Sequence, residues 1–356
     1  MTAKLPVTIV ATSSLDDLLN PEPGRRMDLP GFDADFVDFP DYIIRITDRI
    51  WHQRKVDLCL DYYSADCAIH TLAGDITGAQ TVVDNTYATL KAFPDRRLEA
   101  DNVIWSDEGE GSFYSSHLIT SIMTNEGDSE FGAATGKRVR ILTIADCVCS
   151  NNRIVEEWLV RDNGGLALQL GFDPDAIAKR QAADAPSLIA WHDSARAQLA
   201  NSAANKPQFP QSPEADPEAF AEAFFQTIWA EQALDQIGNH YDFRAVGHFP
   251  NDRQFYGRDD FREFLAAFFA AITNVKIQVH HLADVPYLGD ARDISVRWSL
   301  AGEHSGDGIY GPASGAPIYI MGVTQWRVIN GQIHADWTVW DDIAVRRQIA
   351  EHRLAG

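Results

Sequence analysis

Two acidic residues and two histidines stand at equivalent places of an internal repeat and could transfer protons. His70 matches His248 at an offset of 178 positions, and Glu157 matches Asp336 at an offset of 179. A carboxyl group buried among aromatic side chains has a raised pKa and can act as a general acid or base near neutral pH. A neutral histidine could relay a proton or hydrogen-bond a substrate carbonyl. These four residues are therefore our candidate catalytic groups.

Each candidate also has a purely structural interpretation. Either carboxylate could be ionised and paired with Arg161 or with a neighbouring backbone donor, because structural ion pairs also shift pKa values. Either histidine could make a hydrogen bond that both repeats keep for the fold, since histidines are often only half buried. The residue types alone leave both interpretations open.

The repeat itself spans more than a hundred positions with a single inserted residue. Ile50-Trp51 recurs as Ile228-Trp229, and after the insertion Asp162 recurs as Asp341. We predict two tandem copies of one domain in a chain of 356 residues. The expected parts are an N-terminal arm at 1–34, a first domain at 35–175, a helical and Pro-rich linker at 176–214 and a second domain at 215–356.

Within each copy, helices come first and strands follow. An apolar stripe at helical spacing, Phe220, Phe224 and Ile228, follows Pro217, which suits the first turn of a helix. Asp38 is the expected N-cap of the matching helix in the first copy. Long alternating segments follow, and Asn330-Gly331 is typical of a two-residue hairpin turn. Helices before an antiparallel sheet make an α+β domain.

Composition excludes several classes of protein. The chain carries 30 Lys+Arg against 51 Asp+Glu, a net charge of −21, so we expect no nucleic-acid partner. No segment approaches the roughly 20 apolar residues of a membrane span, and we expect no membrane association and a cytoplasmic location. The four cysteines indicate a reducing compartment and buried thiols, without metal-ligand spacing. No phosphate-binding loop or nucleophile elbow is present, so neither a metal nor a cofactor is expected.

The segments Gly302-Glu-His-Ser-Gly306, Pro312-Ala-Ser-Gly315 and Val328–Trp337 resemble motifs of the SnoaL-like polyketide cyclases, within the nuclear-transport-factor-2-like superfamily. Residues 134–137, 151–158 and 162–171 carry the resemblance in the first copy. It implies two cone-shaped domains, each with N-terminal helices packed on a curved antiparallel sheet. Members of this superfamily pair through their sheets, so the resemblance also implies an internal pseudo-dimer and leaves a further homodimer open.

The family's catalytic positions hold unsuitable residues in both copies. Carried over by the motif, the carboxylate that removes a carbon-bound proton falls on Leu159 and Thr338. Its partner histidine falls on Ala145 and Thr324. None of these four side chains can take such a proton at neutral pH, so the cyclase mechanism is not expected here.

Strand geometry then selects the replacements, because side chains two residues apart share a face. If Leu159 and Thr338 point into the cones, the neighbours of the same parity point there too: Glu157, Arg161, Asp336 and Trp340. We expect Arg161, Leu159, Thr338, Trp326 and Trp340 to contact the ligand, and His304 to lie near the pocket mouth.

We predict binding of a small, apolar carbonyl compound, with cofactor-free proton transfer of the lyase, isomerase or hydrolase kind. The alternative is a binding or carrier protein that kept the cone and lost the base. The missing base favours the carrier, and the polar pocket positions favour the enzyme.

Overall fold

The computed structural model describes residues 6–202 and 216–356, which form two compact units. The first unit comprises the residues up to Thr71, Asp75–Arg161 and Ala283–Gly289. The second comprises Leu72–Gly74, Asp162–Leu282 and Asp290–Gly356. Each unit contains one six-stranded sheet with helices, the α+β architecture expected from the sequence.

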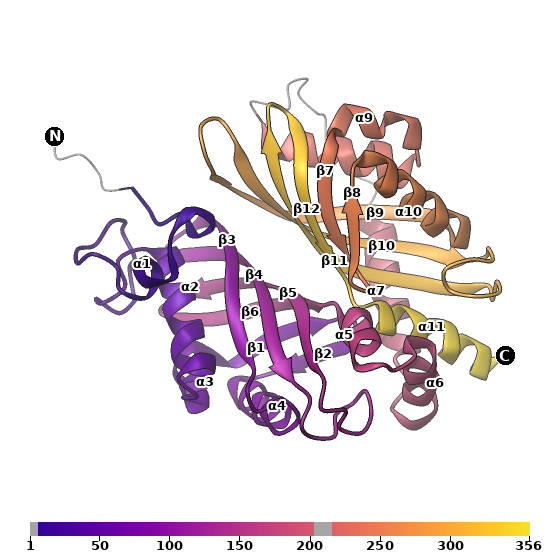
Figure 1. Ribbon diagram of the computed structural model, residues 1–356, viewed down its shortest axis with the longest axis horizontal. Coiled ribbons are helices and arrows are strands. Elements are labelled where there is room, and N and C mark those ends of the chain that lie inside the picture. Colours follow the sequence, from indigo (N-terminus) through magenta and orange to yellow (C-terminus); the bar gives the residue numbers. More distant parts are fainter. Residues whose placement is uncertain (1–5, 203–215) are drawn as a thin grey trace. The chain divides into compact units, whose positions relative to one another are not determined.

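The first sheet has the strand order β2-β1-β6-β5-β4-β3 (Figure 1). Its strands are β1 (Tyr63–Thr71), β2 (Gly74–Thr77), β3 (Arg97–Gly109), β4 (Ser112–Thr124), β5 (Arg138–Ser150) and β6 (Arg153–Arg161). The pairs β3–β4, β4–β5 and β5–β6 are antiparallel, whereas β1 runs parallel to β6. The sheet is therefore mixed, a correction to the purely antiparallel sheet that we expected.

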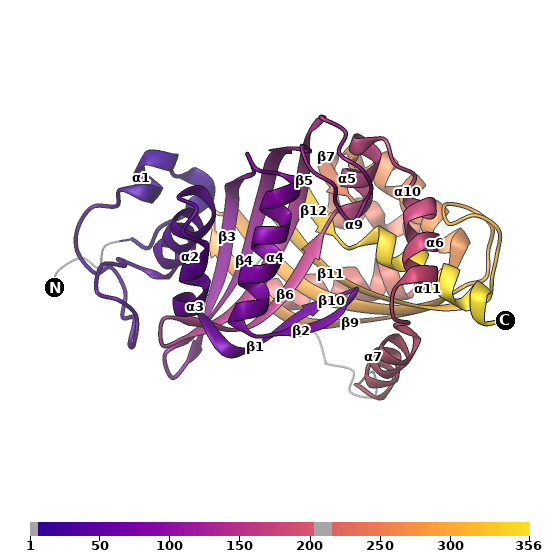
Figure 2. The same cartoon turned by 90° about the horizontal axis from the view of Figure 1, so that it is seen from below.

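The helices of the first unit cover one face of its sheet. They are α1 (Leu15–Leu19), α2 (Phe39–Thr47), α3 (Cys59–Tyr62) and α4 (Ala79–Ala92). Figure 2 shows α4 lying across the strands of this sheet. The Asp38 side chain caps α2 by accepting a hydrogen bond from the Asp41 N–H at 3.0 Å, as predicted. Gly78 precedes α4 with φ of +92°, a conformation that favours glycine.

The second unit repeats the same plan. Its sheet has the order β8-β7-β12-β11-β10-β9, with strands β7 (Tyr241–Phe249), β8 (Arg253–Tyr256), β9 (Ile272–Pro286), β10 (Arg292–His304), β11 (Ala316–Ile329) and β12 (Gln332–Val339). The helices that belong to the second repeat are α8 (Pro217–Phe224), α9 (Ile237–His240), α10 (Arg258–Ala271) and α11 (Asp342–Ala355). Pro217 opens α8, and Asn330-Gly331 forms the β11–β12 turn with φ of +50° and +73°, both as predicted.

The N-terminal arm and the end of the first predicted domain lie where the sequence did not place them. The sequence left the order of the arm at 1–34 open, and in the structure Val10, Leu18, Leu29 and Phe32 are buried in the core of the first unit. Helix α5 (Asn163–Leu170) falls within the predicted first domain at 35–175, yet it packs with α6 (Pro174–Asp184) and α11 in the second unit. Helices α6 and α7 (Ile189–Ser202) cover most of residues 174–202, in the segment predicted as a helical and Pro-rich linker. Its Pro-rich part, 203–215, lies outside the described residues.

Across the described ranges, no helix is both long and apolar enough to cross a membrane.

Candidate functional site

Glu157 lies on the face of the first sheet that helix α2 covers. On α2, the ring of Phe39 packs against Phe113 of β4 at 4.9 Å and against Trp105 of β3 at 6.0 Å. Register places Glu157 beside Cys147, which lies beside Ser115, and Ser115 beside Trp105. Paired residues share a face of a sheet. We call this side of the first sheet the helix-covered face.

Glu157 is 6% exposed, so its carboxyl group is largely removed from water. Burial raises its pKa to about 7, and the positive charge of Arg161 and a hydrogen bond from Tyr63 oppose this effect only in part. Tyr63 matches Tyr241 in the repeat. A carboxyl group poised in this way can either donate or accept a proton at physiological pH.

Several other polar side chains of the helix-covered face are buried without a hydrogen-bond partner among the described residues. They include the Ser115 hydroxyl, Nε2 of His117 and the Thr143 hydroxyl, on residues 0%, 4% and 3% exposed. Burial lowers the pKa of His117 to about 3, so the ring is neutral. Native proteins rarely leave such groups unsatisfied, because each costs free energy that a bound polar molecule would recover.

Asp336 has a different environment in the second unit, where all of its hydrogen bonds are made by protein. Its carboxylate accepts from the Tyr241 hydroxyl at 2.5 Å, Nε1 of Trp326 at 3.0 Å and the Thr338 hydroxyl at 2.6 Å. Thr338 also lies 2.9 Å from the Thr324 hydroxyl. Burial raises the pKa of Asp336 to about 6, against the effect of these three donors.

Tryptophan rings fill the interior around Asp336. Trp298, Trp326 and Trp340 are at most 1% exposed. Trp298 packs 6.1 Å from Trp340, and Trp326 packs 4.7 Å from Phe224 of α8. We expected Trp326 and Trp340 to bind a flat substrate, but both are core residues. They occupy the interior instead of lining a free surface.

The two faces differ residue by residue at the repeat offset of 179. Polar or small residues of the helix-covered face correspond to large apolar residues of the second sheet: Ser115 to Ile294, His117 to Val296, Ser121 to Leu300, Cys147 to Trp326 and Arg161 to Trp340. Glu157 is the exception in this comparison, because its counterpart Asp336 is also acidic. Thr143 corresponds to Gly322, where the Trp298 ring takes the space of a side chain. Among the described residues, the first face presents unsatisfied polar groups on Ser115, His117 and Thr143 beside its acid, whereas the unsatisfied group on the second face is the Nε1 of Trp340.

The structure does not bring the repeated histidines to the acids. Register places His70 beside Trp158 and His248 beside Trp337, on the opposite faces from Glu157 and Asp336. The two ring nitrogens of His70 contact Asp75 at 2.9 Å and Glu156 at 3.1 Å. Nδ1 of His248 bonds Gln254 at 2.6 Å, and its Nε2 lies 3.5 Å from Asp162. Both histidines therefore make local structural contacts on the opposite faces of the sheets. They do not assist Glu157 or Asp336.

His304 stabilises a loop instead of lining a pocket mouth. Its Nδ1 lies 2.9 Å from the Ser314 hydroxyl, and its carbonyl accepts from the Ser314 and Gly315 N–H groups. The equivalent Asn125 accepts from the Thr135 N–H and hydroxyl at 2.8 and 3.0 Å. Both copies thus brace the same loop with a different side chain.

Comparison with known proteins decides the family. The model of the SnoaL-like polyketide cyclases matches residues 41–170 and 219–349, which together make up most of the chain. The chain belongs to the SnoaL-like polyketide cyclase family. Among curated proteins, none matches it.

Solved structures resemble one domain at a time. A Jannaschia sp. CCS1 protein assigned to the SnoaL-like polyketide cyclases is 18% identical, over 41% of this chain and 98% of its own, with a TM-score of 0.33. A SnoaL-like polyketide cyclase from Agrobacterium tumefaciens is 18% identical, over 37% and 95%, with a TM-score of 0.30. A protein of ketosteroid isomerase-like fold from Catenulispora acidiphila is 15% identical, over 36% and 89%, with a TM-score of 0.29.

The positions that correspond to the SnoaL-like base and histidine lie side by side in both sheets. Leu159 pairs with Ala145, and Thr338 pairs with Thr324. Leu159 packs against the core of the first unit, and Thr338 belongs to the hydrogen-bond network of Asp336. Arg161 is exposed, and its charge reaches Glu157. Among the described residues, Glu157 and Asp336 are the buried strand acids that parity brings to these faces, each two residues from the family position.

Sequence reasoning overlooked most of the polar groups of the helix-covered face. The sequence patterns singled out none of Ser115, His117, Thr143 and Arg96. Aligning the two copies at the offset of 179 could have identified these groups. One face of an alternating strand carries polar residues in the first copy and apolar residues in the second. Among the described residues, no group of three or more His, Cys, Asp or Glu could hold a metal ion. All four cysteines are free and buried.

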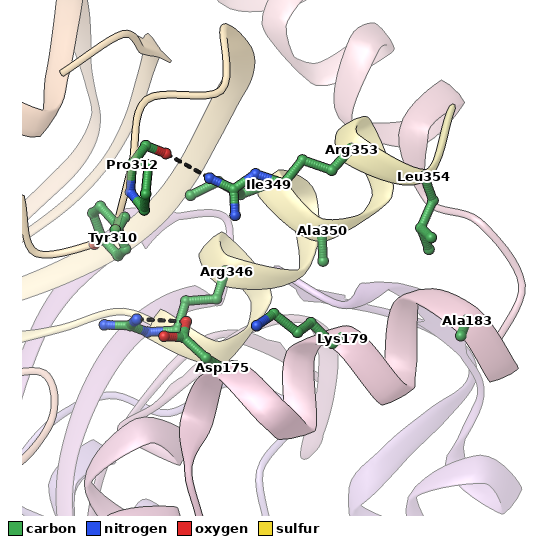
Figure 3. A pocket seen from close by; sticks show the side chains of 11 residues that line it. Asp175, Lys179, Ala183, Tyr310, Pro312, Arg346, Ile349, Ala350, Arg353 and Leu354 are labelled. Carbon is green, nitrogen blue, oxygen red and sulfur yellow. Dashed lines mark hydrogen bonds and ion pairs between the residues drawn. The ribbon is translucent and has the colours of Figure 1, made fainter. Parts of the chain in front are cut away.

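One cavity of about 350 Å³ lies in the second unit between α6, α11 and the 310–312 loop (Figure 3). Its two best-placed arginines are already engaged: Arg346 contacts Asp342 at 2.7 Å and Asp175 at 2.8 Å, and Arg353 donates to the Pro312 carbonyl. None of the candidate residues lines this cavity. Its polar groups hold α11 in place, so it is a weaker candidate than the helix-covered face.

Proposed function

We propose that the first domain binds a small, largely apolar carbonyl compound on its helix-covered face and that Glu157 transfers a proton to or from it. The second domain, with its interior filled, serves as a structural partner. The observation that carries this proposal is a buried carboxyl group with a pKa of about 7 beside polar groups that lack a protein partner.

The surroundings of Glu157 support such a ligand. Leu159, Ala145 and Trp105 supply apolar surface on the same face, and the Thr143 hydroxyl and neutral His117 can hydrogen-bond a carbonyl oxygen. General acid–base catalysis needs a group whose pKa lies near the working pH, and Glu157 meets this condition without a cofactor. The chemistry would be of the lyase, isomerase or hydrolase kind.

A carrier without chemistry is the second candidate. The observation that favours it is the loss of the family base at both Leu159 and Thr338, with hydroxyl and methyl groups where the partner histidine would stand.

Native mass spectrometry of the full chain from cell extract tests ligand binding. We expect a retained small molecule on the wild type and on Asp336→Asn, because the second interior is filled. Retention on neither protein would contradict the proposal.

Deuterium exchange separates the two candidates. We expect the wild type to accelerate exchange of the α-hydrogens of 2-tetralone in D₂O, and Glu157→Gln to lose roughly 10²–10⁴-fold of this rate. Asp336→Asn is the matched control and should keep it. Retention of a cellular ligand with no exchange in any variant would favour the carrier.

A further inference from the structure

The connection between α4 and β3 buries a positive charge, that of Arg96, and none of the ion pairs found in the described parts of the chain involves it. Arg96 is 8% exposed, and its Nε has no hydrogen-bond partner among the described residues. One of its terminal nitrogens reaches the Ser121 hydroxyl at 3.4 Å, a long contact. Ser121 lies on the helix-covered face, two strand steps beyond His117.

The charges around Arg96 are of the same sign. The groups that act on its guanidinium are those of Arg161 and Arg54, and together with burial they lower its pKa to about 9. The Arg54 side chain donates to the Arg96 carbonyl at 2.8 Å and so holds this turn in place. Arg96 therefore remains a cation at neutral pH, inside a cluster of three arginines.

Neighbouring acids are engaged elsewhere. Asp95 accepts from the Thr124 N–H at 2.6 Å and from its hydroxyl at 2.7 Å. Glu99 lies 3.4 Å from exposed Arg97. Glu157 feels the charge of Arg161, and Arg96 is not among the groups that shift its pKa. A buried charge without a partner costs several kcal/mol of stability, so a chain that keeps one gains from an external anion.

We propose that Arg96 forms the anion subsite of the first domain, so that the ligand carries a carboxylate group. This inference rests on the proposed function in placing the ligand on the helix-covered face. The planar guanidinium matches a carboxylate in a two-point contact, and the Ser121 hydroxyl can add a third donor. Arg161, at the exposed edge of the same face, would attract the anion toward Arg96.

The second copy shows which residues the same fold uses at the positions equivalent to Arg96 and Ser121. The position 179 residues after Arg96 is Val275, and Ser121 corresponds to Leu300. Val275 lies in β9, which begins directly after α10, so the second copy makes this connection without an arginine at that position.

The test is an NMR titration of the full chain labelled with ¹⁵N. The Nε–H signal of Arg96 is identified by its loss in Arg96→Lys, and sodium acetate, benzoate and 2-naphthoate are added at constant ionic strength against sodium chloride. We expect at least one carboxylate to shift this signal saturably, with benzamide and chloride without effect. No saturable shift with any of the three would overturn the proposal.

A variant pair gives a second readout. Arg96→Met should bind the carboxylate at least tenfold more weakly, and its melting temperature without ligand should equal or exceed that of the wild type, because a buried unpaired charge is removed. Arg97→Met, at an exposed neighbouring site, should bind like the wild type. A large drop in the melting temperature of Arg96→Met alone would assign Arg96 a structural role and contradict the inference.

Failure of this inference is distinguishable from failure of the proposed function. Glu157→Gln should leave carboxylate binding intact or tighten it, since it removes a negative charge. If a carboxylate shifts the Arg96 Nε–H signal but no variant exchanges α-hydrogens, the anion subsite is supported and proton transfer is refuted. Exchange that depends on Glu157, with no saturable carboxylate shift at Arg96, would support proton transfer and refute the anion subsite.

Discussion

At the scale of single residues, Glu157 and Asp336 are both buried but differ in their hydrogen-bond partners. Asp336 accepts three hydrogen bonds from protein groups, whereas the described contacts of Glu157 are a hydrogen bond from Tyr63 and the charge of Arg161. The sequence left open whether each acid would be buried with a raised pKa or ionised and paired. It could not predict which acid would have its hydrogen-bond acceptors occupied by protein donors, because Tyr241 and Trp326 reach Asp336 from other strands.

The raised pKa of Glu157 makes stability depend on pH. Its folded-state pKa of about 7 lies above the ordinary value of 4.5, so the folded state holds the proton more tightly than the unfolded state does. Its contribution to the free energy of unfolding is therefore present below pH 4.5 and is lost as pH rises toward 7. The shift corresponds to roughly 3 kcal/mol.

We therefore expect Glu157→Gln to flatten this part of the pH dependence. The variant should match the wild type near pH 4.5 and exceed it in stability above pH 7, as measured by urea unfolding across that range. Asp336→Asn should not reproduce this gain, because the side-chain amide would face three hydrogen-bond donors. Equal pH slopes for the wild type and Glu157→Gln would contradict the raised pKa.

At the scale of elements, hairpins and helix starts were the most predictable features. Asp38, Pro217 and Asn330-Gly331 act locally, so their roles follow from a few neighbouring residues. The parallel β1–β6 pair and the inclusion of the N-terminal arm in the core depend on contacts between distant segments. Local patterns carry no information about these.

Strand β11 depends on glycine at one position because of a neighbouring ring. A Cβ atom at Gly322 would overlap the Trp298 indole. We expect Gly322→Ala to lower the free energy of unfolding by about 1–3 kcal/mol through overpacking. Thr143→Ala, at the equivalent place in β5, should change stability by less than about 1 kcal/mol, because its hydroxyl has no described partner. Calorimetric melting of both variants checks this contrast.

At the scale of the whole molecule, the tandem family match confirms the duplication, while the boundaries of a stable fragment depend on α5, α6 and α7. These helices precede the second repeat, yet they contact α11. Arg346 reaches Asp175 at 2.8 Å, and the Leu188 N–H donates to Glu351 at 3.3 Å. A fragment that starts at residue 215 loses all of these contacts.

We predict that residues 162–356 form a more stable fragment than residues 215–356. The shorter fragment should aggregate or dimerise, and the longer one should show the higher melting temperature. Analytical ultracentrifugation distinguishes the sources of this effect. If the longer fragment is monomeric, α5–α7 are sufficient to cover the apolar surface of the second repeat. If it is dimeric, the result supports pairing of the two repeats as an internal pseudo-dimer in the full chain. A shorter fragment that stays monomeric at high concentration would refute both.

The packed indoles of the second domain also give the chain an optical signature. Trp229 and Trp298 lie 5.3 Å apart at 41°, and Trp298 and Trp340 lie 6.1 Å apart at 70°. Transition dipoles at such short range and oblique angles couple, so their circular dichroism should split into bands of opposite sign. Loss of that couplet on heating would report the melting of one half of the molecule alone, and Trp340→Phe should weaken it.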